Sequence, residues 1–141
     1  MREKFSLVII TYNNADTLER CLAAADFADE IVVLDSGSTD ATVQIAQRHG
    51  ARVAFHPFDD YGPQKQRAID MAAHDWILNL DADEVLSPGT REAIERALEN
   101  PAVAGFRLPR RERMFWSVQH RLSHRNGHLR LFDRRRARMN D

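Results

Sequence analysis

The sequence predicts an α/β fold, in which a mostly parallel β-sheet is covered by helices on both faces. Short apolar, β-branched segments alternate along the chain with segments whose apolar residues recur at helical spacing. Each apolar segment ends in a polar loop, as expected where parallel strands present their carboxyl ends. With 141 residues, of which 43% are apolar, the chain has the length and composition of one domain with a buried core.

Two strand–helix units open the chain. Residues 5–10 predict a buried strand that ends in the polar run Thr11–Asn14. A helix over about residues 15–25, capped by Asn14 or Asp16, follows from the apolar positions Leu18, Cys21, Leu22 and Ala25. The second unit has a strand at 30–35, a loop at 36–40 and a helix at 41–49 that ends at Gly50.

The alternation continues through the rest of the chain. We expect a strand at 52–55, a loop at 56–63 marked by two prolines and a glycine, and a helix at 64–73. A strand at 76–80 ends on Asp81–Glu84, and Ser87-Pro88 begins a helix with Ile94, Ala97 and Leu98 inward. Further strands are predicted at 103–108 and 128–133, whereas residues 110–125 have no clear period.

Charge is divided unevenly along the chain. Residues 1–106 hold 9 Lys and Arg against 18 Asp and Glu, whereas residues 107–141 hold 11 Arg against 3 acids. The Arg-rich end is either a solvated surface or a contact for an anionic partner.

Hydropathy and cysteine content exclude several classes of protein. The sequence has no run of about 18 apolar residues and no signal-peptide core, so we expect a soluble, cytoplasmic protein. The single cysteine, Cys21, excludes a disulfide framework and a thiolate metal cage, and its place on the apolar side of a predicted helix favours a core position.

Asp81 and Asp83 are candidate metal ligands. In an extended chain, residues two apart point to the same side, so these carboxylates should converge while Ala82 and Glu84 face away. A hard cation such as Mg²⁺ or Mn²⁺, with a diphosphate-bearing ligand, would relieve their repulsion. An acidic turn without a ligand is the alternative.

Asp35–Asp40, with the sequence DSGSTD, is a candidate nucleotide loop. A carboxylate ends the strand, Gly37 allows close approach of a ligand to the backbone, and Ser38 or Thr39 can begin a helix. An ordinary capped turn is the alternative. Together with Thr11–Asn14 and Asp81–Glu84, it makes three polar loops at strand ends.

These three loops carry a family resemblance. The segments VIITYNN at 8–14, VVLDSGSTD at 32–40 and LNLDADE at 78–84 occur in this order and resemble glycosyltransferase family two over roughly residues 5–100. Within that stretch, residues 62–69 occupy the place of the family's basic helix-opening motif. Arg130–Phe132, before an Arg run, is similar to the bacterial lipopolysaccharide-core branch.

The resemblance implies a GT-A fold, which is Rossmann-like, with a sheet that this chain completes only in part. We expect residues 1–108 to form a nucleotide-sugar-binding core and residues 109–141 an Arg-rich, partial acceptor-side segment of the same domain. The implied activity is inverting transfer from a nucleoside-diphosphate sugar, in particular a UDP-sugar, to a saccharide or lipid-linked acceptor such as lipopolysaccharide core.

The resemblance also assigns roles to single residues. The implied donor-binding residues are Thr11, Tyr12, Asn13, Asp35, Gly37, Ser38, Lys65 and Asp81. Asp35 would contact the base or ribose of the nucleotide. Lys65 would lie near the base or phosphates; the alternative for Lys65 is an exposed cation at the start of a helix. Asp81 would hold ribose or metal, and Asp83 would be the principal metal ligand and the catalytic residue of the D-x-D.

The general base of an inverting transfer is missing from the recognisable motifs. In the lipopolysaccharide-core branch a His-Glu pair follows the segment similar to residues 129–134, and none occurs before Asp141. We therefore expect a C-terminally shortened chain whose base lies beyond Asp141. The other carboxylates considered are Glu84, Glu112, Asp133 and Asp141. His120, His124 and His128 are spaced by four, but Asn126 and Gly127 interrupt that helix, which favours surface histidines.

Other functions fit the sequence less well. A sugar-phosphate nucleotidyltransferase needs a Gly-rich basic loop after the first strand, and an oxidoreductase or Walker-type ATPase needs its own glycine motif there, which residues 11–14 lack. The remaining alternatives are an inactive or fragmentary sugar-nucleotide-binding module, and a binder of an anionic surface through its Arg-rich tail. The acidic residues 1–106 disfavour nucleic acid, whereas contact with an anionic membrane at its inner face suits a lipid-linked acceptor.

Overall fold

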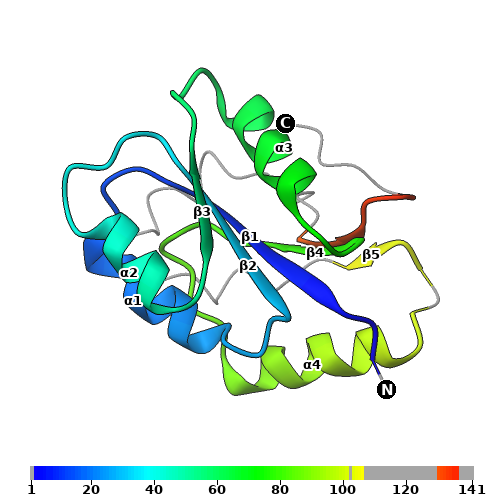
Figure 1. Ribbon diagram of the computed structural model, residues 1–141. Helices are drawn as coiled ribbons and strands as arrows, with labels where there is room; N and C mark the ends of the chain where they lie inside the picture. Colours follow the sequence, from blue (N-terminus) through cyan, green and yellow to red (C-terminus); the bar gives the residue numbers. More distant parts are fainter. Residues whose placement is uncertain (1, 102, 107–129, 137–141) are drawn as a thin grey trace, which may run out of the picture.

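A computed structural model describes residues 2–101, 103–106 and 130–136 (Figure 1). Strands and helices alternate from the N-terminus to α4, as the sequence predicts. The elements are β1 (Phe5–Thr11), α1 (Ala15–Ala24), β2 (Glu30–Asp35), α2 (Thr42–Arg48), β3 (Arg52–Phe55), α3 (Tyr61–Met71), β4 (Trp76–Asn79), α4 (Pro88–Glu99), β5 (Gly105–Phe106) and β6 (Leu131–Asp133).

The described strands form one sheet in the order β3-β2-β1-β4-β6-β5. β3, β2, β1 and β4 are parallel, whereas β6 is antiparallel to both β4 and β5. Thr11 pairs with Asp35 and Val8 pairs with Asn79, so β1, β2 and β4 end at the same edge of the sheet. We call this the carboxyl edge and the opposite one, where these strands begin, the amino edge.

Helices cover both faces of the sheet. On one face, α1, α2 and α4 pack their apolar sides on alternate strand residues, with Leu18, Ile45 and Leu98 in one buried cluster. On the other face, α3 contributes Ala68 and Ile69 to a second cluster. Figure 1 shows the same division, with α3 on the opposite side of the sheet from α1, α2 and α4. The predicted α/β class and mostly parallel sheet are therefore confirmed.

Helix α3 begins at Tyr61, earlier than the predicted start at Gln64. Asp60 precedes the helix in an extended conformation, and its carboxylate accepts a hydrogen bond from the N–H of Tyr61 at 2.8 Å. Pro63 then lies in the first turn, where its missing N–H removes no helical hydrogen bond. The Gly-Pro pair therefore belongs to the helix and not to the preceding loop.

The remaining predicted helices and strands are present with shifted bounds, and Asn14 stands at the N-cap of α1 without the predicted side-chain capping hydrogen bond. Ser87 caps α4, since its Oγ accepts from the N–H of Thr90 at 3.2 Å. The predicted strands at 103–108 and 128–133 appear as the shorter β5 and β6; residues 103–104 and 130 are described but lie outside a strand, and 107–108 and 128–129 are outside the described part. Among the described residues, no helix has the length and apolar character needed to cross a membrane.

Candidate donor and metal site

The loops after β1 and β2 are joined by hydrogen bonds. The N–H of Asn13 donates to Ser38 Oγ and the N–H of Thr39 donates to Asn13 Oδ1, each at 2.8 Å. Asn13 has φ of +54°, in the left-handed region that Asn tolerates better than most residues. The N–H of Asn14 donates to Thr42 Oγ1 at 2.8 Å. The two loops therefore form one preorganised unit, which we call the donor loops.

Asp35 organises the donor loops from the end of β2. Its Oδ1 accepts from the hydroxyls of Thr11 and Ser38, both at 2.6 Å. Its Oδ2 accepts from the N–H groups of Gly37 at 2.9 Å and Ser38 at 2.8 Å. Four hydrogen bonds fill the acceptor capacity of a carboxylate. Burial opposes the ionisation of Asp35, but the hydrogen bonds from Ser38 and Thr11 outweigh it and hold its pKa below the ordinary value. Contact of Asp35 with a base or ribose stays a prediction.

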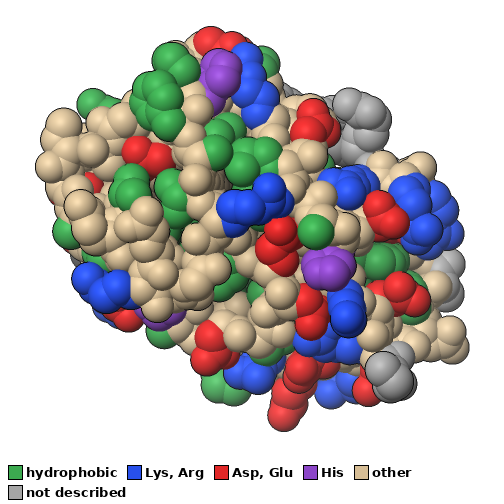
Figure 2. Space-filling model, viewed as in Figure 1, with side chains coloured by type: hydrophobic (Ala, Val, Ile, Leu, Met, Phe, Trp, Pro, Cys, Tyr) green, Lys and Arg blue, Asp and Glu red, His purple; other side chains and the backbone are tan. Residues whose placement is uncertain are grey.

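Exposed aromatic side chains surround the donor loops. Tyr12 is 59% exposed and Phe55, at the end of β3, is 64% exposed. Gly37 has φ of +103°, and a Cβ built on it would stand 3.4 Å from Phe55 Cε1. Phe58 and Tyr61 pack edge to face at 5.0 Å between ring centroids. Figure 2 shows hydrophobic side chains at the upper left, over the segment that joins β3 to α3. Flat ring faces are thus available beside the donor loops.

Helix α3 carries two buried polar side chains, and one of them, Gln64, reaches the loop after β2. Gln64 is fully buried, and its Nε2 donates to Ser36 Oγ and to the His56 carbonyl, each at 3.1 Å. Lys65 is only 5% exposed and lies inside α3, so the alternative of an exposed helix-start cation is wrong. The motif at 62–69 is visible in the sequence, but the role of Gln64 is not, since an amide on a helix with several charged residues gives no signal of burial.

The D-x-D lies in a turn that follows β4. The N–H of Glu84 donates to the Asp81 carbonyl at 3.0 Å, and β4 already ends at Asn79, so the expectation of an extended chain through both aspartates is wrong. The exposure nevertheless alternates as predicted, because Asp81 and Asp83 are partly exposed while Ala82 and Glu84 are buried. Both aspartates therefore reach solvent at the carboxyl edge.

Arg130 lies beneath this turn, directly before β6. Its Nη1 donates to Glu84 Oε1, the oxygen that also accepts from the N–H of Asp81 at 2.7 Å. Its Nη2 lies 3.8 Å from Asp81 Oδ2. The Cys21 thiol is 3.6 Å from the Asp81 carbonyl, and burial raises the pKa of this thiol, so Cys21 is a core residue as expected. In the sequence, Arg130 stands out only as part of the motif at 130–132, and its pairing with Glu84 was not predicted.

A divalent cation is compatible with Asp81 and Asp83. Within residues 2–101, 103–106 and 130–136, no three His, Cys, Asp or Glu side chains form a group that could hold a metal ion. Mg²⁺, and Mn²⁺ similarly, takes one or two protein carboxylates and completes its shell with phosphate oxygens and water. Two carboxylates on one partly exposed turn match that mode of binding. The metal and a diphosphate would therefore bind together.

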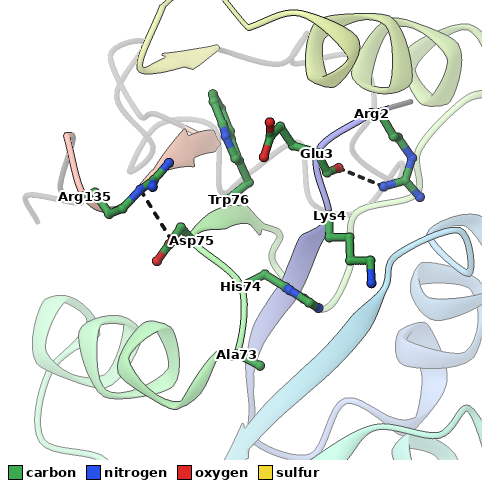
Figure 3. Close-up of a pocket in the computed structure, with 8 residues that line it drawn as sticks. All are labelled: Arg2, Glu3, Lys4, Ala73, His74, Asp75, Trp76 and Arg135. Atoms are coloured by element: carbon green, nitrogen blue, oxygen red, sulfur yellow. Dashed lines mark hydrogen bonds and ion pairs between the residues drawn. The ribbon is translucent and has the colours of Figure 1, made fainter.

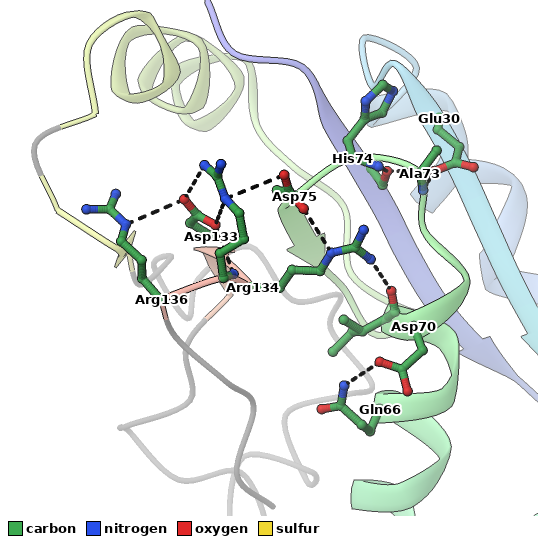
Figure 4. A network of polar contacts seen from close by, with 12 residues as sticks. Glu30, Gln66, Asp70, Ala73, His74, Asp75, Asp133, Arg134 and Arg136 are labelled. Atoms are coloured by element: carbon green, nitrogen blue, oxygen red, sulfur yellow. Dashed lines mark hydrogen bonds and ion pairs between the residues drawn. The ribbon is translucent and has the colours of Figure 1, made fainter.

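The arginines after β6 lie at the opposite edge, because β6 runs antiparallel to β4. Arg134 Nε is 3.3 Å from Asp75, and Arg135 and Arg136 lie 2.8 and 3.5 Å from Asp133 (Figure 4). A cavity of about 500 Å³ opens at this edge beside the starts of β1 and β4 (Figure 3). Of the arginines that the structure describes at 130–136, only Arg130 is next to the D-x-D.

The structure locates two of the carboxylates considered as general bases. Glu84 is buried against Arg130, and Asp133 is 1% exposed and paired with Arg135 at the amino edge. Neither is placed to accept a proton from an acceptor hydroxyl at the carboxyl edge. The other candidates, and the histidines spaced by four, lie outside the described residues: Glu112, His120, His124, His128 and Asp141.

A mostly parallel sheet with polar loops at the carboxyl ends of its strands is typical of α/β proteins that bind their ligands at that edge. Residues 6–141 match the profile of Glycosyl transferase family 2. The chain therefore belongs to this family, as its motifs indicated.

Curated relatives agree with that membership. An uncharacterized glycosyltransferase of Rickettsia bellii is 45% identical over 96 residues, which cover 67% of this chain and 33% of the relative. The lipopolysaccharide core biosynthesis glycosyltransferase LpsC of Rhizobium meliloti is 34% identical over 112 residues, covering 75% of this chain and 42% of LpsC. The chain thus spans about a third of the length of the Rickettsia relative.

Solved structures share the fold. Glucosyl-3-phosphoglycerate synthase from Mycobacterium tuberculosis, in complex with Mn²⁺, uridine diphosphate and phosphoglyceric acid, matches with a TM-score of 0.58 at 24% identity, over 73% of this chain and 41% of that one. Staphylococcus aureus TarS 1-349, in complex with UDP-GlcNAc, matches with a TM-score of 0.54 at 24% identity, over 64% and 30%. The fold of this chain is therefore the GT-A fold, with part of its sheet represented here.

Proposed function

We propose that this chain binds a nucleoside-diphosphate sugar, in particular a UDP-sugar, at the carboxyl edge of its sheet, as the donor half of an inverting glycosyltransferase. The proposal rests on one observation above all: two loops locked together by hydrogen bonds lie at the ends of β1 and β2, beside a strand that ends in a D-x-D turn. Solved structures of the same fold in complex with UDP support a uridine nucleotide.

The donor loops bind and orient the nucleotide. Tyr12, Asn13 and Thr11 border the base from the β1 side, and the exposed ring of Tyr12 offers it a flat apolar face. Gly37 and Ser38 line the β2 side, where Asp35 fixes their N–H groups. Because these groups are held before the ligand arrives, little ordering accompanies binding. Lys65, buried on α3, contributes a positive charge toward the phosphates.

Asp83 and Asp81 hold a divalent cation, Mg²⁺ or Mn²⁺, together with the diphosphate. When bound, the cation supplies charge neutralisation to the departing nucleoside diphosphate. Among the residues that the structure describes, no general base is assigned, because Glu84 and Asp133 are each paired with an arginine. Sugar transfer is thus a separate question from donor binding and is measured separately.

The acceptor we propose is a saccharide or a lipid-linked saccharide such as lipopolysaccharide core, on the basis of the relative LpsC. A lipid-linked acceptor would bring the chain to the inner face of the membrane, with Arg-rich residues 109–141 as the contact. The described arginines 134–136 lie at the amino edge, and a membrane contact through them would turn the donor loops away from a membrane-bound acceptor, so these three arginines do not support the contact. Vesicle binding that salt abolishes and UDP-sugar does not affect would support a pure surface binder instead.

Calorimetry with UDP in the presence of Mn²⁺ tests donor binding. We expect the folded protein to bind UDP in Mn²⁺ and EDTA to remove most of this affinity. Asp83→Ala should lose most of the affinity even when Mn²⁺ is present. Asp26→Ala is the matched control, because Asp26 is an exposed aspartate whose side chain pairs only with Arg91 in the contacts described here. Absence of binding by the folded wild type, or equal binding by wild type and Asp83→Ala, would overturn the proposal.

A further inference from the structure

Arg130 is a buried cation beside the turn in which Asp81, Asp83 and Glu84 follow one another closely. The residue is 8% exposed, and its guanidinium spans the D-x-D turn from beneath. Nη1 donates to Glu84 Oε1 and lies 3.4 Å from the Asn79 carbonyl, while Nη2 faces the Asp81 carboxylate at 3.8 Å. The planar fork of arginine allows one side chain to address both carboxylates.

Glu84 transmits this contact to the backbone of the D-x-D. Its Oε1 accepts from both Arg130 and the N–H of Asp81, the second at 2.7 Å. The Glu84 N–H closes the turn on the Asp81 carbonyl at 3.0 Å. Both the main chain and the side chain of Asp81 are therefore tied to a single Arg–Glu pair.

The charges of the turn require such a partner. Asp81, Asp83 and Glu84 together carry three negative charges, and a buried carboxylate is stable only when paired. Arg130 pairs with Glu84 and also lies 3.8 Å from the Asp81 carboxylate, so it reduces the repulsion among the three carboxylates of the turn. Arg130 belongs to the segment before β6, so this cation reaches the turn from the far end of the described sequence.

We propose that Arg130 is a positioning residue of the metal site: through Glu84 and Asp81 it holds the D-x-D turn in the shape that binds a divalent cation together with a diphosphate. The inference rests on the proposed donor function. It assigns a role at the carboxyl edge to a residue outside residues 1–108. Groups that orient metal ligands commonly change metal affinity by about 10- to 100-fold when they are removed.

The metal enhancement of UDP affinity tests this role. It is the ratio of the UDP affinity in Mn²⁺ to that in EDTA, measured by calorimetry on the same folded sample. Arg130→Met should lower this ratio by about tenfold or more. A purely structural role would reduce the folded fraction and leave the ratio of the folded protein unchanged. Arg134→Met is the matched control, because Arg134 pairs with Asp75 at the amino edge.

A second variant covers the case in which Arg130→Met does not fold. Arg130→Met/Glu84→Gln removes both buried charges and keeps an oxygen for the N–H of Asp81, so thermal unfolding should recover while the metal enhancement stays low. If the metal enhancement is unchanged in the folded double variant, and unchanged also in Arg134→Met, the proposed role of Arg130 is overturned while the proposed donor function stands. A wild type that binds no UDP would overturn the proposed function itself.

Discussion

Replacing Asp35 by Asn should separate the charge of this side chain from its hydrogen bonds. The amide oxygen of Asn can still accept from the N–H groups of Gly37 and Ser38. In the wild type, the hydroxyls of Thr11 and Ser38 donate to Asp35 Oδ1. In the variant, each hydroxyl can rotate and accept a hydrogen bond from the amide NH₂. Asp35→Asn therefore keeps the number of hydrogen bonds and loses their charge.

The magnitude follows from that difference. Hydrogen bonds to charged groups contribute about 1.5–3 kcal/mol, against about 0.5–1.5 kcal/mol for neutral ones. All four hydrogen bonds are weaker in Asp35→Asn, but the neutral amide avoids the cost of burying a charge, which offsets part of this loss. We therefore expect Asp35→Asn to lower the free energy of unfolding by about 1–2 kcal/mol. Asp35→Ala leaves two N–H groups without their acceptor, at about 1–3 kcal/mol each, and should cost about 3–5 kcal/mol.

The effect of Asp35→Asn should depend on pH. The folded-state pKa of Asp35 is below its ordinary value, so the stabilisation by the ionised carboxyl is complete above the unfolded pKa of about 3.9 and is lost as pH falls through the folded pKa. The difference in free energy of unfolding between wild type and Asp35→Asn should therefore be constant between about pH 7 and about pH 5 and shrink below about pH 4.

Urea unfolding followed by tryptophan fluorescence measures these differences. Asp26→Asn serves as the control, since Asp26 is exposed and should show little change. Equal stability of wild type and Asp35→Asn near neutral pH would refute the argument from the four hydrogen bonds. A difference that persists unchanged in acid would show that the lost interaction is not the ionised carboxyl.

Two further changes test the packing around the site. Gly37→Ala places a side chain at φ of +103°, and we expect a loss of about 1–2 kcal/mol in urea unfolding; an unchanged midpoint would contradict the backbone assignment. Cys21, buried with a raised thiol pKa, should resist an aromatic disulfide reagent until the protein unfolds, so that its modification rate follows urea concentration. Rapid modification of the native protein would place this thiol at the surface.

The sequence predicted the strands and helices whose signals are local. Apolar β-branched runs and helical spacing indicated β1 to α4, and Ser87-Pro88 fixed the start of α4 because its cap uses only neighbouring residues. The predicted start of α3 at Gln64 was too late, because Gly62 and Pro63 suit a first helical turn as well as a loop. The carboxylate of Asp60 accepts a hydrogen bond from the N–H of Tyr61, and this cap places the start of the helix at Tyr61.

The site was predictable in its location and only partly in its contacts. The carboxyl ends of β1, β2 and β4 follow from topology, so the donor loops and D-x-D fall together. The engagement of both Asp35 oxygens, and the Arg130–Glu84 pair, depend on how distant segments pack. Residues separated as widely as 84 and 130 leave no periodic pattern that links them.

The strand order has a consequence for the path by which the chain folds. β5 precedes β6 in sequence but lies outside it, so β5 cannot join the sheet before residues 131–133 have paired with β4. During synthesis, the β4 edge of the sheet, with Trp76 and Leu78, waits unpaired while the intervening residues emerge from the ribosome. An open apolar edge of this kind can pair with another chain. The segment that brings Arg130 to the D-x-D therefore also covers the β4 edge.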